Sequence, residues 1–384
     1  VQLKIRATYG KTGNTNEGAL GYYSWRSSYG QNGANGYDFG SEYSYVNSLV
    51  EKALANVGAT WEKGRKFNVG LDASIRKGMF RLTAEYYRDR YYGLLQQRGS
   101  TIKLIGIAYP NENIGENLYE GQELSLTYQH HLGKFNYFLT ANASRMRSEV
   151  LYMNEVFQKY SWNRRTGMPV GQTFGYMADG LIQTQEQADA APLLGVNPVH
   201  PRDVKLIDLN EDGVINIYDQ TAIGNTKPLV YYGATLGFNV GGFDFSVLLQ
   251  GVANRSYQKT EYSFGSNGES QGFSYMMGRW TPETASTATY PRLTIGSDPT
   301  NTPFLNNSSY WTRSGEYLRV RNVDLGYTFP FRLSRRINIA ALRIFANAQN
   351  LFTITPYDRL DPEITSETSY PAQRTVVLGV NIKL

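Results

Sequence analysis

The sequence predicts an all-β fold, with roughly ten strands of a large antiparallel transmembrane β-barrel that carries long extracellular loops. Three observations predict it. Apolar and polar residues alternate with a period of two in many segments of barrel length. The connections between these segments are alternately very short and very long. The 384 residues include 38 glycines, 30 tyrosines and 17 phenylalanines, a composition that suits many strands and turns.

The alternation is clear where Phe67, Val69 and Leu71 are interleaved with polar residues. The segments that show it are 3–9, 67–75, 80–86, 124–128, 135–143, 232–240, 243–249, 323–329, 342–348 and 376–384. A strand of about 9–11 residues crosses a membrane, with alternate side chains in lipid and in the lumen. In the last segment the residues predicted to face lipid are Val376, Leu378, Val380, Ile382 and Leu384. Those predicted to face the lumen are Thr375, Val377, Gly379, Asn381 and Lys383.

The connections indicate a membrane barrel more strongly than the strands do. Tight turns are expected at 77–78, 132–134 and 241–242, and long loops at 11–66, 93–120, 147–230 and 254–316. If the last strand ends in the periplasm, every short turn is periplasmic and every long loop is extracellular, as in outer-membrane barrels. The alternative is a soluble β-sandwich or propeller, but sandwich strands are shorter and their turn signals recur every 8–12 residues or so.

Composition excludes several other classes of protein. The mean hydropathy is −0.44, and no run of about 18 apolar residues predicts a membrane helix. The absence of cysteine excludes disulfides and thiolate chemistry. The net charge of +5 is scattered, so no nucleic-acid partner is expected. The chain begins at Val1 within a strand pattern, without an initiator methionine or a signal peptide, so a segment upstream of it is expected.

Residues 208–219 carry the spacing of an EF-hand calcium loop. Oxygen-bearing side chains stand at loop positions 1, 3, 5, 9 and 12, glycine stands at position 6, and aspartate replaces the usual glutamate at position 12, as in dockerin-type loops. The spacing therefore predicts a Ca²⁺ ion in an extracellular loop. Its expected ligands are Asp208, Asn210, Asp212, Val214 (through its carbonyl), Asn216 and Asp219. The alternative is a metal-free turn rich in Asp and Asn.

No arrangement of the three histidines predicts catalysis. His130 and His131 end a strand beside a short turn, and His200 lies in a long loop. A Ser-His-Asp site needs a histidine between a nucleophile and an acid, and no spacing in the sequence suggests one. The protein is therefore not expected to be an enzyme.

The aromatic residues have two interpretations. Those near strand ends are typical of an interfacial girdle: Tyr86, Tyr87, Tyr91, Tyr92, Tyr327 and Phe329. Trp280, Tyr310 and Trp311 fall in a long loop, where they either pack within the loop or stack on a sugar or a peptide.

Five motifs resemble the SusC-like family of TonB-dependent outer-membrane transporters of Bacteroidetes, and the resemblance covers essentially the whole chain. They are NLYEGQELSLTYQ (117–129), GQTFGYMADGLIQTQEQ (171–187), YLRVRNVDLGYTFP (317–330), LRIFANAQNLFTITPYDRLDPEI (342–364) and YPAQRTVVLGVNIKL (370–384). In the first, Gln122 stands where this family more often has valine or isoleucine. The motifs at 317–330 and 342–364 are the most specific.

The resemblance implies that residues 1–384 are the C-terminal part of a barrel of about 22 strands. The plug and the N-terminal strands are then expected outside this chain, because an open sheet edge is unstable in lipid. It implies import of a nutrient, an oligosaccharide or a peptide, across the bacterial outer membrane. The implied partners are a SusD-like surface lipoprotein lid, the remaining N-terminal barrel and plug segment, TonB acting through that segment, and outer-membrane lipid.

Three other functions compete with import. A passive porin would be an open channel without a plug, a barrel enzyme would hydrolyse its substrate, and a surface binding or structural protein would transport nothing.

Overall fold

The large sheet of this protein has ten antiparallel strands. The computed structural model describes residues 1–16, 22–41, 44–101, 106–258, 274–293, 298, 300, 307–334, 339–357, 360–364 and 369–383. In sheet order the strands are β1 (Gln2–Asn14), β4 (Glu62–Ile75), β5 (Phe80–Gln96), β6 (Glu112–Leu132), β7 (Phe135–Tyr152), β14 (Val230–Val240), β15 (Phe243–Ala253), β18 (Tyr317–Thr328), β19 (Ala341–Ile354) and β20 (Thr375–Lys383).

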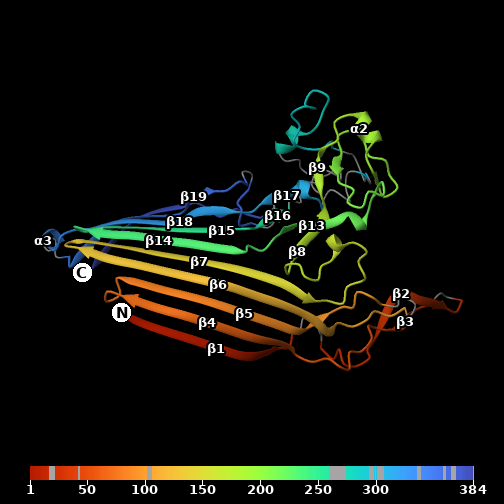
Figure 1. The fold of residues 1–384 in the computed structure, drawn as a ribbon, viewed down its shortest axis with the longest axis horizontal. Helices are drawn as coiled ribbons and strands as arrows, with labels where there is room; N and C mark the ends of the chain where they lie inside the picture. Colours follow the sequence, from red (N-terminus) through yellow and green to blue (C-terminus); the bar gives the residue numbers. More distant parts are fainter. Residues whose placement is uncertain are drawn as a thin grey trace.

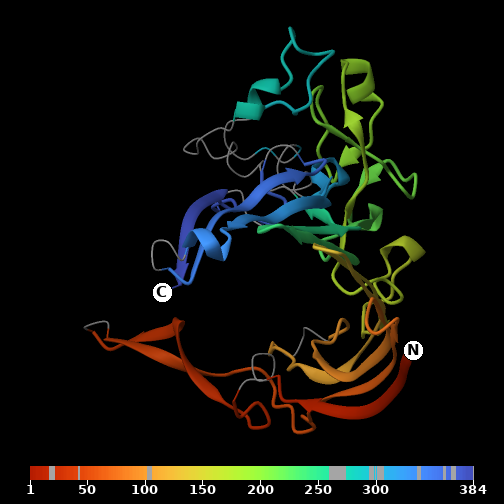
Figure 2. The same cartoon turned by 90° about the vertical axis from the view of Figure 1, so that its left-hand side faces the viewer.

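Each strand of this sheet pairs with its neighbours in chain order, and the sheet curves into an open arc (Figures 1 and 2). β1 and β20 are its two edges, and within the described residues they do not pair with each other. These ten strands are the ten that the sequence predicts, so the fold class is confirmed as part of a large antiparallel barrel. Among the described residues no helix is long and apolar enough to cross a membrane.

Several strands are longer than the sequence pattern predicts. β5 has 17 residues, β6 has 21 and β7 has 18, against the expected ~9–11 for a membrane crossing. The ladder between β5 and β6 runs as far as the pair Gln96 and Glu112, so much of the expected loop at 93–120 is strand. The hydrophobic alternation ends before the ladder does, because the outer parts of these strands carry charged side chains in place of apolar ones.

The tight connections all lie at one end of the sheet, which we call the turn end. Arg76, Lys77 and Gly78 turn the chain with φ of 50°, 56° and 90°, and Gly241 and Gly242 do so with φ of 55° and 93°. Glycine adopts such left-handed angles at no steric cost. The connection between β18 and β19 at the same end holds the short helix α3 (Phe331–Ser334). The long connections lie at the opposite end, the loop end (Figure 1).

The loop end carries a hairpin and a separate packed unit (Figure 1). The hairpin is β2 (Tyr29–Phe39) with β3 (Ser44–Glu51). We call the packed unit the outer module, the described residues within 160–225 and 274–314. Its elements are η2 (Ser161–Asn163), β8 (Gln172–Tyr176), β9 (Ala178–Leu181), α2 (Gln185–Asp189), β10 (Leu193–Leu194), β11 (Val204–Leu206), β12 (Val214–Ile215), η3 (Ile217–Asp219), β13 (Gln220–Asn225), η5 (Ser274–Gly278), η7 (Ser309–Trp311) and β17 (Thr312–Ser314), which pairs with β16 (Ser256–Gln258).

The outer module has a core of its own. It joins residues of both long loops: Tyr176, Leu181, Ile182, Ala188, Leu194, Val199, Val204, Leu206, Ile215, Met276, Tyr290 and Trp311. The ten-strand sheet, in contrast, leaves large apolar side chains such as Ile5 and Leu378 exposed. The protein therefore buries its core beside the sheet, at the loop end.

Candidate functional site

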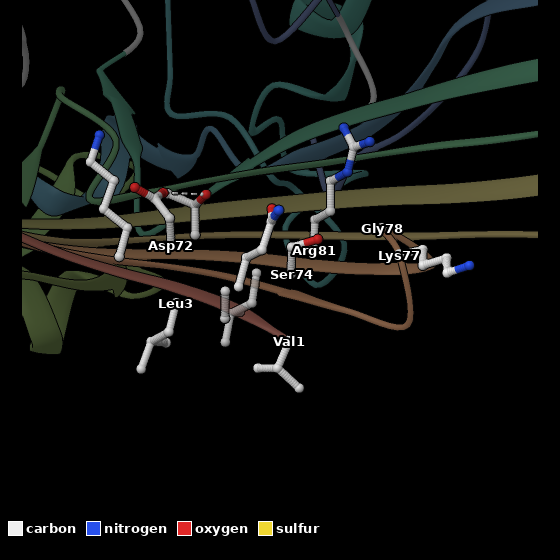
Figure 3. Close-up of a pocket in the computed structure, with 12 residues that line it drawn as sticks. Val1, Leu3, Asp72, Ser74, Lys77, Gly78 and Arg81 are labelled. Atoms are coloured by element: carbon white, nitrogen blue, oxygen red, sulfur yellow. Dashed lines mark hydrogen bonds between the residues drawn. The ribbon is translucent and has the colours of Figure 1, made fainter.

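The two faces of the large sheet differ in chemistry. Because side chains alternate across a strand, the register places Leu3 and Ile5 on one face with Leu71, and Lys4 and Arg6 on the other. Figure 3 shows this near the edge strand, where Val1 and Leu3 point away from the side that carries Asp72 and Arg81. The apolar face is the convex, outward face of the arc, and the polar face is the concave one.

The register of β19 and β20 continues this division. Leu378 is opposite Ala346, which is itself opposite Leu325 on the apolar face. Val377 is opposite Asn347, on the face of the polar residues. The facing expected for Thr375–Lys383 thus agrees with the register, whereas Leu384 lies outside the described residues.

Aromatic rings form a band on the apolar face at the turn end. Ring centroids across neighbouring strands are 4.4–5.7 Å apart: Phe80 with Tyr128, Tyr128 with Tyr137, Phe238 with Phe245, and Phe243 with Tyr327. Phe329, just after the end of β18, extends the band, with its ring 5.0 Å from that of Tyr327. Such a band is typical of a membrane interface. It includes Tyr327 and Phe329, as the sequence predicts.

The four tyrosines of β5 divide between the two faces. Tyr86 and Tyr92 face outward, but Tyr87 faces inward, where its ring covers Gly121, and Tyr91 covers Gly64 on the same side. The expectation that all four belong to a girdle is therefore wrong for Tyr87 and Tyr91, because neighbouring residues of a strand point to opposite faces.

Ion pairs cross the concave face in two places. Near β1, Arg6 contacts Asp72 at 2.9 Å and Glu85 at 2.5 Å, and Thr83 donates to Asp72 at 3.0 Å (dashed in Figure 3). The guanidinium lies over Gly70, where a Cβ would stand 2.9 Å from it, so glycine makes room for the arginine.

The second ion-pair group, near the other edge, repeats this design. Arg343 contacts Asp324 at 2.8 Å and also binds Asp244, and it lies over Gly326. Both groups use an arginine, a facing glycine and carboxylates from adjacent strands. They give the concave wall ordered, paired charges suited to contact with water or with protein.

A cavity of about 880 Å³ lies beside β1 (Figure 3). It is lined by residues of β1, β4 and β5, including Lys4, Asp72 and Arg81. Because the cavity borders the open edge of the sheet, its shape does not indicate a ligand site.

A buried arginine lies where the sheet meets its last loop. Arg319 of β18 is 2% exposed and contacts Asp361 at 2.5 Å, and it also pairs with Glu363. Thr353 of β19 accepts a hydrogen bond from the guanidinium at 2.9 Å, and Tyr317 donates to Glu363 at 2.8 Å. The group therefore fastens the loop before β20 to the outer ends of β18 and β19.

The pKa of one carboxyl of this group, Asp361, is lowered. Burial alone would raise the pKa of Asp361, but hydrogen bonds from the backbone of Glu363 and from Arg319 outweigh it and hold the pKa below its usual range. Arg319, Asp361 and Glu363 lie within the sequence motifs at 317–330 and 342–364. The sequence alone predicts no role for them, because two distant carboxylates and one arginine have no diagnostic spacing.

The structure brings the predicted calcium ligands together in one loop of the outer module. Asp208 accepts hydrogen bonds from the backbone of Glu211 at 2.8 Å and of Gly213 at 2.7 Å. Asp212 accepts one from the backbone of Val214 at 2.9 Å, and the amide of Asn210 donates to Asp212 at 2.9 Å. Gly213, at loop position 6, has the φ of 83° that the sharp turn requires.

The last ligand position already has a structural role. Asp219 is fully buried and accepts hydrogen bonds from the backbone of Leu209 at 2.9 Å and of Asn216 at 2.8 Å. Asn216 caps η3 in return by accepting from the backbone of Tyr218. Burial raises the pKa of Asp219. In the part of the chain that the structure describes, no three acidic or histidine side chains form a preformed metal cluster. Carboxylate oxygens nevertheless keep further lone pairs after accepting one hydrogen bond.

The calcium-type loop is anchored by η2. The indole of Trp162 donates to the carbonyl of Tyr218 at 2.8 Å. The amide of Asn163 donates to the carbonyls of Ile217 at 3.1 Å and Gln220 at 2.7 Å. The end of the loop is therefore held in place from outside its own sequence.

A buried ion pair joins the two long loops that build the outer module. Asp203 is fully buried, binds Arg292 at 2.6 Å and accepts the backbone N–H of His200 at 2.9 Å. Arg292 also contacts Asp298 at 2.8 Å. Asp203 comes from the loop before β14 and Arg292 from the loop after β15, so the pair links segments 89 residues apart.

The tryptophans of the outer module are part of its packing. Trp311 and Trp280 are buried, with Trp311 against Tyr290 and Trp280 under the guanidinium of Arg202 at 3.9 Å. Loop packing is thus the correct interpretation of these two rings, and stacking on a sugar or peptide is excluded by their burial.

Comparison with known proteins finds similar proteins over nearly the whole chain. No family model matches. The chain is 25% identical over 406 residues to the TonB-dependent receptor P3 of Formosa agariphila, which covers 94% of this chain and 39% of that receptor. It is 26% identical over 403 residues to the TonB-dependent receptor SusC of Bacteroides thetaiotaomicron, which covers 99% of this chain and 37% of that receptor.

Solved structures share the fold. The chain superposes on a structure of the RagAB peptide importer in its open-open state with a TM-score of 0.73 and 19% identity, over 100% of this chain and 40% of that one. A structure of the RagAB peptide transporter gives a TM-score of 0.72 and 20% identity, over 99% and 40%. The chain thus spans about two fifths of the length of the proteins it matches.

Proposed function

Because this chain is a SusC-like member of the TonB-dependent transporters, we propose that it forms the C-terminal part of an importer in a bacterial outer membrane. The imported nutrient is an oligosaccharide or a peptide. The partners in this proposal are an N-terminal barrel and plug segment, TonB acting through that segment, and a SusD-like lipoprotein that closes over the loop end.

The observation that carries the proposal is the two-faced, ten-stranded wall. Its convex face is apolar with an aromatic band, as lipid contact requires, and its concave face is polar with ordered ion pairs. The open edges β1 and β20 fit a barrel completed by further strands. The relatives support transport in place of catalysis, since their names are those of receptors and importers.

Uptake by the full-length transporter, in cells with and without TonB, tests the proposal. Deleting the gene is expected to abolish growth on one nutrient class, offered as either oligosaccharides or oligopeptides, and deleting TonB is expected to do the same. Deleting the gene of the paired lipoprotein is expected to weaken uptake at low nutrient concentration. Uptake that persists without TonB would instead indicate a passive porin, and unchanged growth on every nutrient would indicate a surface protein that does not transport.

We also propose that the loop 208–219 binds one Ca²⁺ ion on the extracellular side. Support comes from the twelve-residue spacing, from the left-handed turn at Gly213, and from the convergence of the Asp208, Asn210 and Asp212 side chains on one loop. The ion would take oxygens from Asp208, Asn210, Asp212, the carbonyl of Val214, Asn216 and Asp219.

Metal analysis of the purified full-length protein tests the calcium proposal. The double substitution Asp208→Ala with Asp212→Ala is expected to remove the bound calcium. Asp189→Ala, which removes an acid from α2 outside the loop, is the matched control and should leave the calcium content unchanged. An equal calcium content in wild type and double variant would show that the loop is a metal-free turn.

A further inference from the structure

The outward face of the first five strands of the large sheet changes from apolar to charged toward the loop end. On β1, Tyr9 is followed on the same face by Lys11, and on β7, Ala143 is followed by Arg145 and Arg147. We call the charged outward residues of this zone the outer belt: Lys11, Lys63, Arg65, Arg88, Arg90, Glu116, Glu120, Arg145, Arg147 and Glu149.

The outer belt is strongly basic. Seven of its residues are basic and three are acidic, and every basic one is exposed. The acidic residues lie close to basic neighbours: Arg90 contacts Glu116 at 2.6 Å, and Arg147 contacts Glu149 at 3.4 Å. An excess of four positive charges therefore remains on a surface that faces outward.

Like charges stand directly opposite one another within the outer belt. Lys11 is opposite Arg65, and Arg65 is opposite Arg90, across three adjacent strands. Such pairs are destabilising unless an anion lies between them. Arg65 rests on the ring of Tyr92 at 5.0 Å, and in the described part of the chain neither it nor Lys11 nor Arg145 has a carboxylate partner.

The outer belt is level with respect to a membrane. The register pairs Lys11 of β1, strand by strand, with Glu149 of β7. On β7, however, the outward residues become basic already at Arg145, which lies four residues closer to the turn end. From β1 to β7, the boundary between apolar and charged outward residues therefore moves by four residues toward the turn end. This is about 13 Å along the strands over four strand spacings, or about 19 Å across the sheet. That slope corresponds to a tilt of about 35°, within the range of barrel strands.

Among the described residues, the other side of the sheet lacks such a belt. On β18 and β19 the outward residues at the loop end are Leu318, Val320, Phe352 and Ile354. All four are apolar, and Phe352 and Ile354 are exposed. The basic residues of the belt are therefore a local feature, since solubility at the rim would require charge all round it.

We propose that the outer belt binds the phosphate groups of lipid headgroups in the membrane leaflet on the loop side. Guanidinium groups present paired N–H donors that match phosphate oxygens, and lysine supplies a compact charge. On the outward face, Tyr86 and Gln122 lie between the apolar residues and the outer belt, as interfacial residues do. The phosphates would neutralise the row of Lys11, Arg65 and Arg90. The inference rests on the proposed membrane location but not on transport.

Titration of the full-length protein in detergent with lipid A, a phosphorylated glycolipid, followed by native mass spectrometry, tests this proposal. The belt variant is Lys11→Gln, Arg65→Gln and Arg145→Gln, which keeps the pair of Arg90 with Glu116. The control removes three cations from the concave face: Lys4→Gln, Lys66→Gln and Arg81→Gln. Surface cations each contribute severalfold to binding of anionic lipid, so the belt variant should bind about tenfold more weakly or worse, and the control should match wild type.

Two further measurements keep the test decisive if the belt variant fails to insert. Wild type should bind phosphate-free lipid A as weakly as the belt variant binds lipid A. The variant Glu116→Gln with Glu120→Gln raises the positive charge of the belt and should bind lipid A several times more tightly than wild type. Equal binding of the two lipids by wild type, or equal binding by the belt variant and the control, would overturn the proposal. Either result would leave uptake untouched, because uptake is measured separately.

Discussion

The ten-strand wall and the outer module place their apolar side chains on opposite sides. On the wall, Leu378 is 80% exposed and Ile5 is 71% exposed. In the module, Ile215 is fully buried and Val204 is 1% exposed. The two regions nevertheless share one chain, and the strands of the wall continue directly into the module.

The proposed membrane location explains this difference, because two solvents would then act on the protein. Hydrocarbon is the solvent of the wall, so its apolar side chains point outward and its backbone hydrogen bonds are satisfied between strands. Water is the solvent of the module, so its apolar side chains gather inside. Arg319 lies at the junction between the wall and the outer module, where its charge is buried and paired with Asp361.

The largest expected effect is at this junction. Arg319→Ala leaves Asp361 without its cationic partner in a buried site and leaves Glu363 with Arg321 alone, which costs about 3–5 kcal/mol. We expect the midpoint of unfolding by guanidinium chloride, measured on the full-length protein in detergent, to fall accordingly. Arg321→Ala is the control: its side chain is 39% exposed and also contacts Glu363, at 3.0 Å, so it should cost about 1 kcal/mol or less. Equal losses would show that the junction is not a buried charge site.

The next effect separates the two solvents by the same kind of truncation. Ile215→Ala leaves a cavity in the module core and should lower its free energy of unfolding by about 2–5 kcal/mol. Leu378→Ala removes a similar volume from the wall, but lipid chains fill the space and are as apolar as leucine. We therefore expect little change in the midpoint for Leu378→Ala, measured in lipid bilayers. A comparable loss at both positions would contradict the assignment of lipid to the convex face.

A charge placed on the wall sharpens the comparison further. Leu378→Lys puts an ammonium group into hydrocarbon, at about 2–4 kcal/mol near the membrane midplane, whereas Val377→Lys puts it on the concave side. The amount of heat-modifiable, assembled full-length protein should fall sharply for the first and much less for the second. Equal amounts would mean that the facing of β20, or the barrel itself, is wrong.

The wall could be predicted from sequence because a period of two is a local signal. The alternation around residues such as Val69 and Leu71 indicates directly which face of the sheet each residue lies on. The regular alternation of short and long connections indicates that strands adjacent in sequence are also adjacent in the sheet. The outer parts of β5, β6 and β7 escaped prediction because Arg88 and Glu120 keep the ladder while losing the apolar alternation. A strand with polar side chains on both faces shows no alternation of apolar and polar residues in its sequence.

The module could be predicted only where a motif was complete within one segment. The loop 208–219 has that property, because its candidate ligands lie in one short segment. Its calcium ion stays a prediction. The core around Ile215 and the pair of Asp203 with Arg292 join segments far apart in the chain. Their partners depend on how two loops fold against each other, which no local spacing encodes.

A smaller effect is expected from the ion pair inside the module. Asp203→Ala leaves Arg292 without its closer carboxylate and should cost about 1.5–3 kcal/mol, because a charge-assisted hydrogen bond is lost in a buried site. Limited proteolysis of the full-length protein should cut the outer module faster, while the wall stays resistant. Asp179→Ala breaks an exposed contact with Lys205 at 2.6 Å and serves as the control, with no change expected. Unchanged cleavage in Asp203→Ala would show that the two loops do not depend on this pair.

The smallest expected effect is in the response to acid, and it should appear separately in the two regions. Hydrogen bonds from the backbone of Glu363 and from Arg319 hold the pKa of Asp361 low, and Thr300 and Arg292 do the same for Asp298, although burial opposes both. A carboxyl whose pKa is lowered on folding stabilises the folded state above its unfolded pKa, at about 4, and loses that contribution as the pH falls through the lowered value. Asp361→Asn should therefore flatten the acid dependence of the barrel's heat-modifiable form without altering proteolysis of the module. Asp298→Asn should flatten only the acid dependence of that proteolysis. If either substitution changed both readouts equally, the wall and the outer module would be one cooperative unit in place of two.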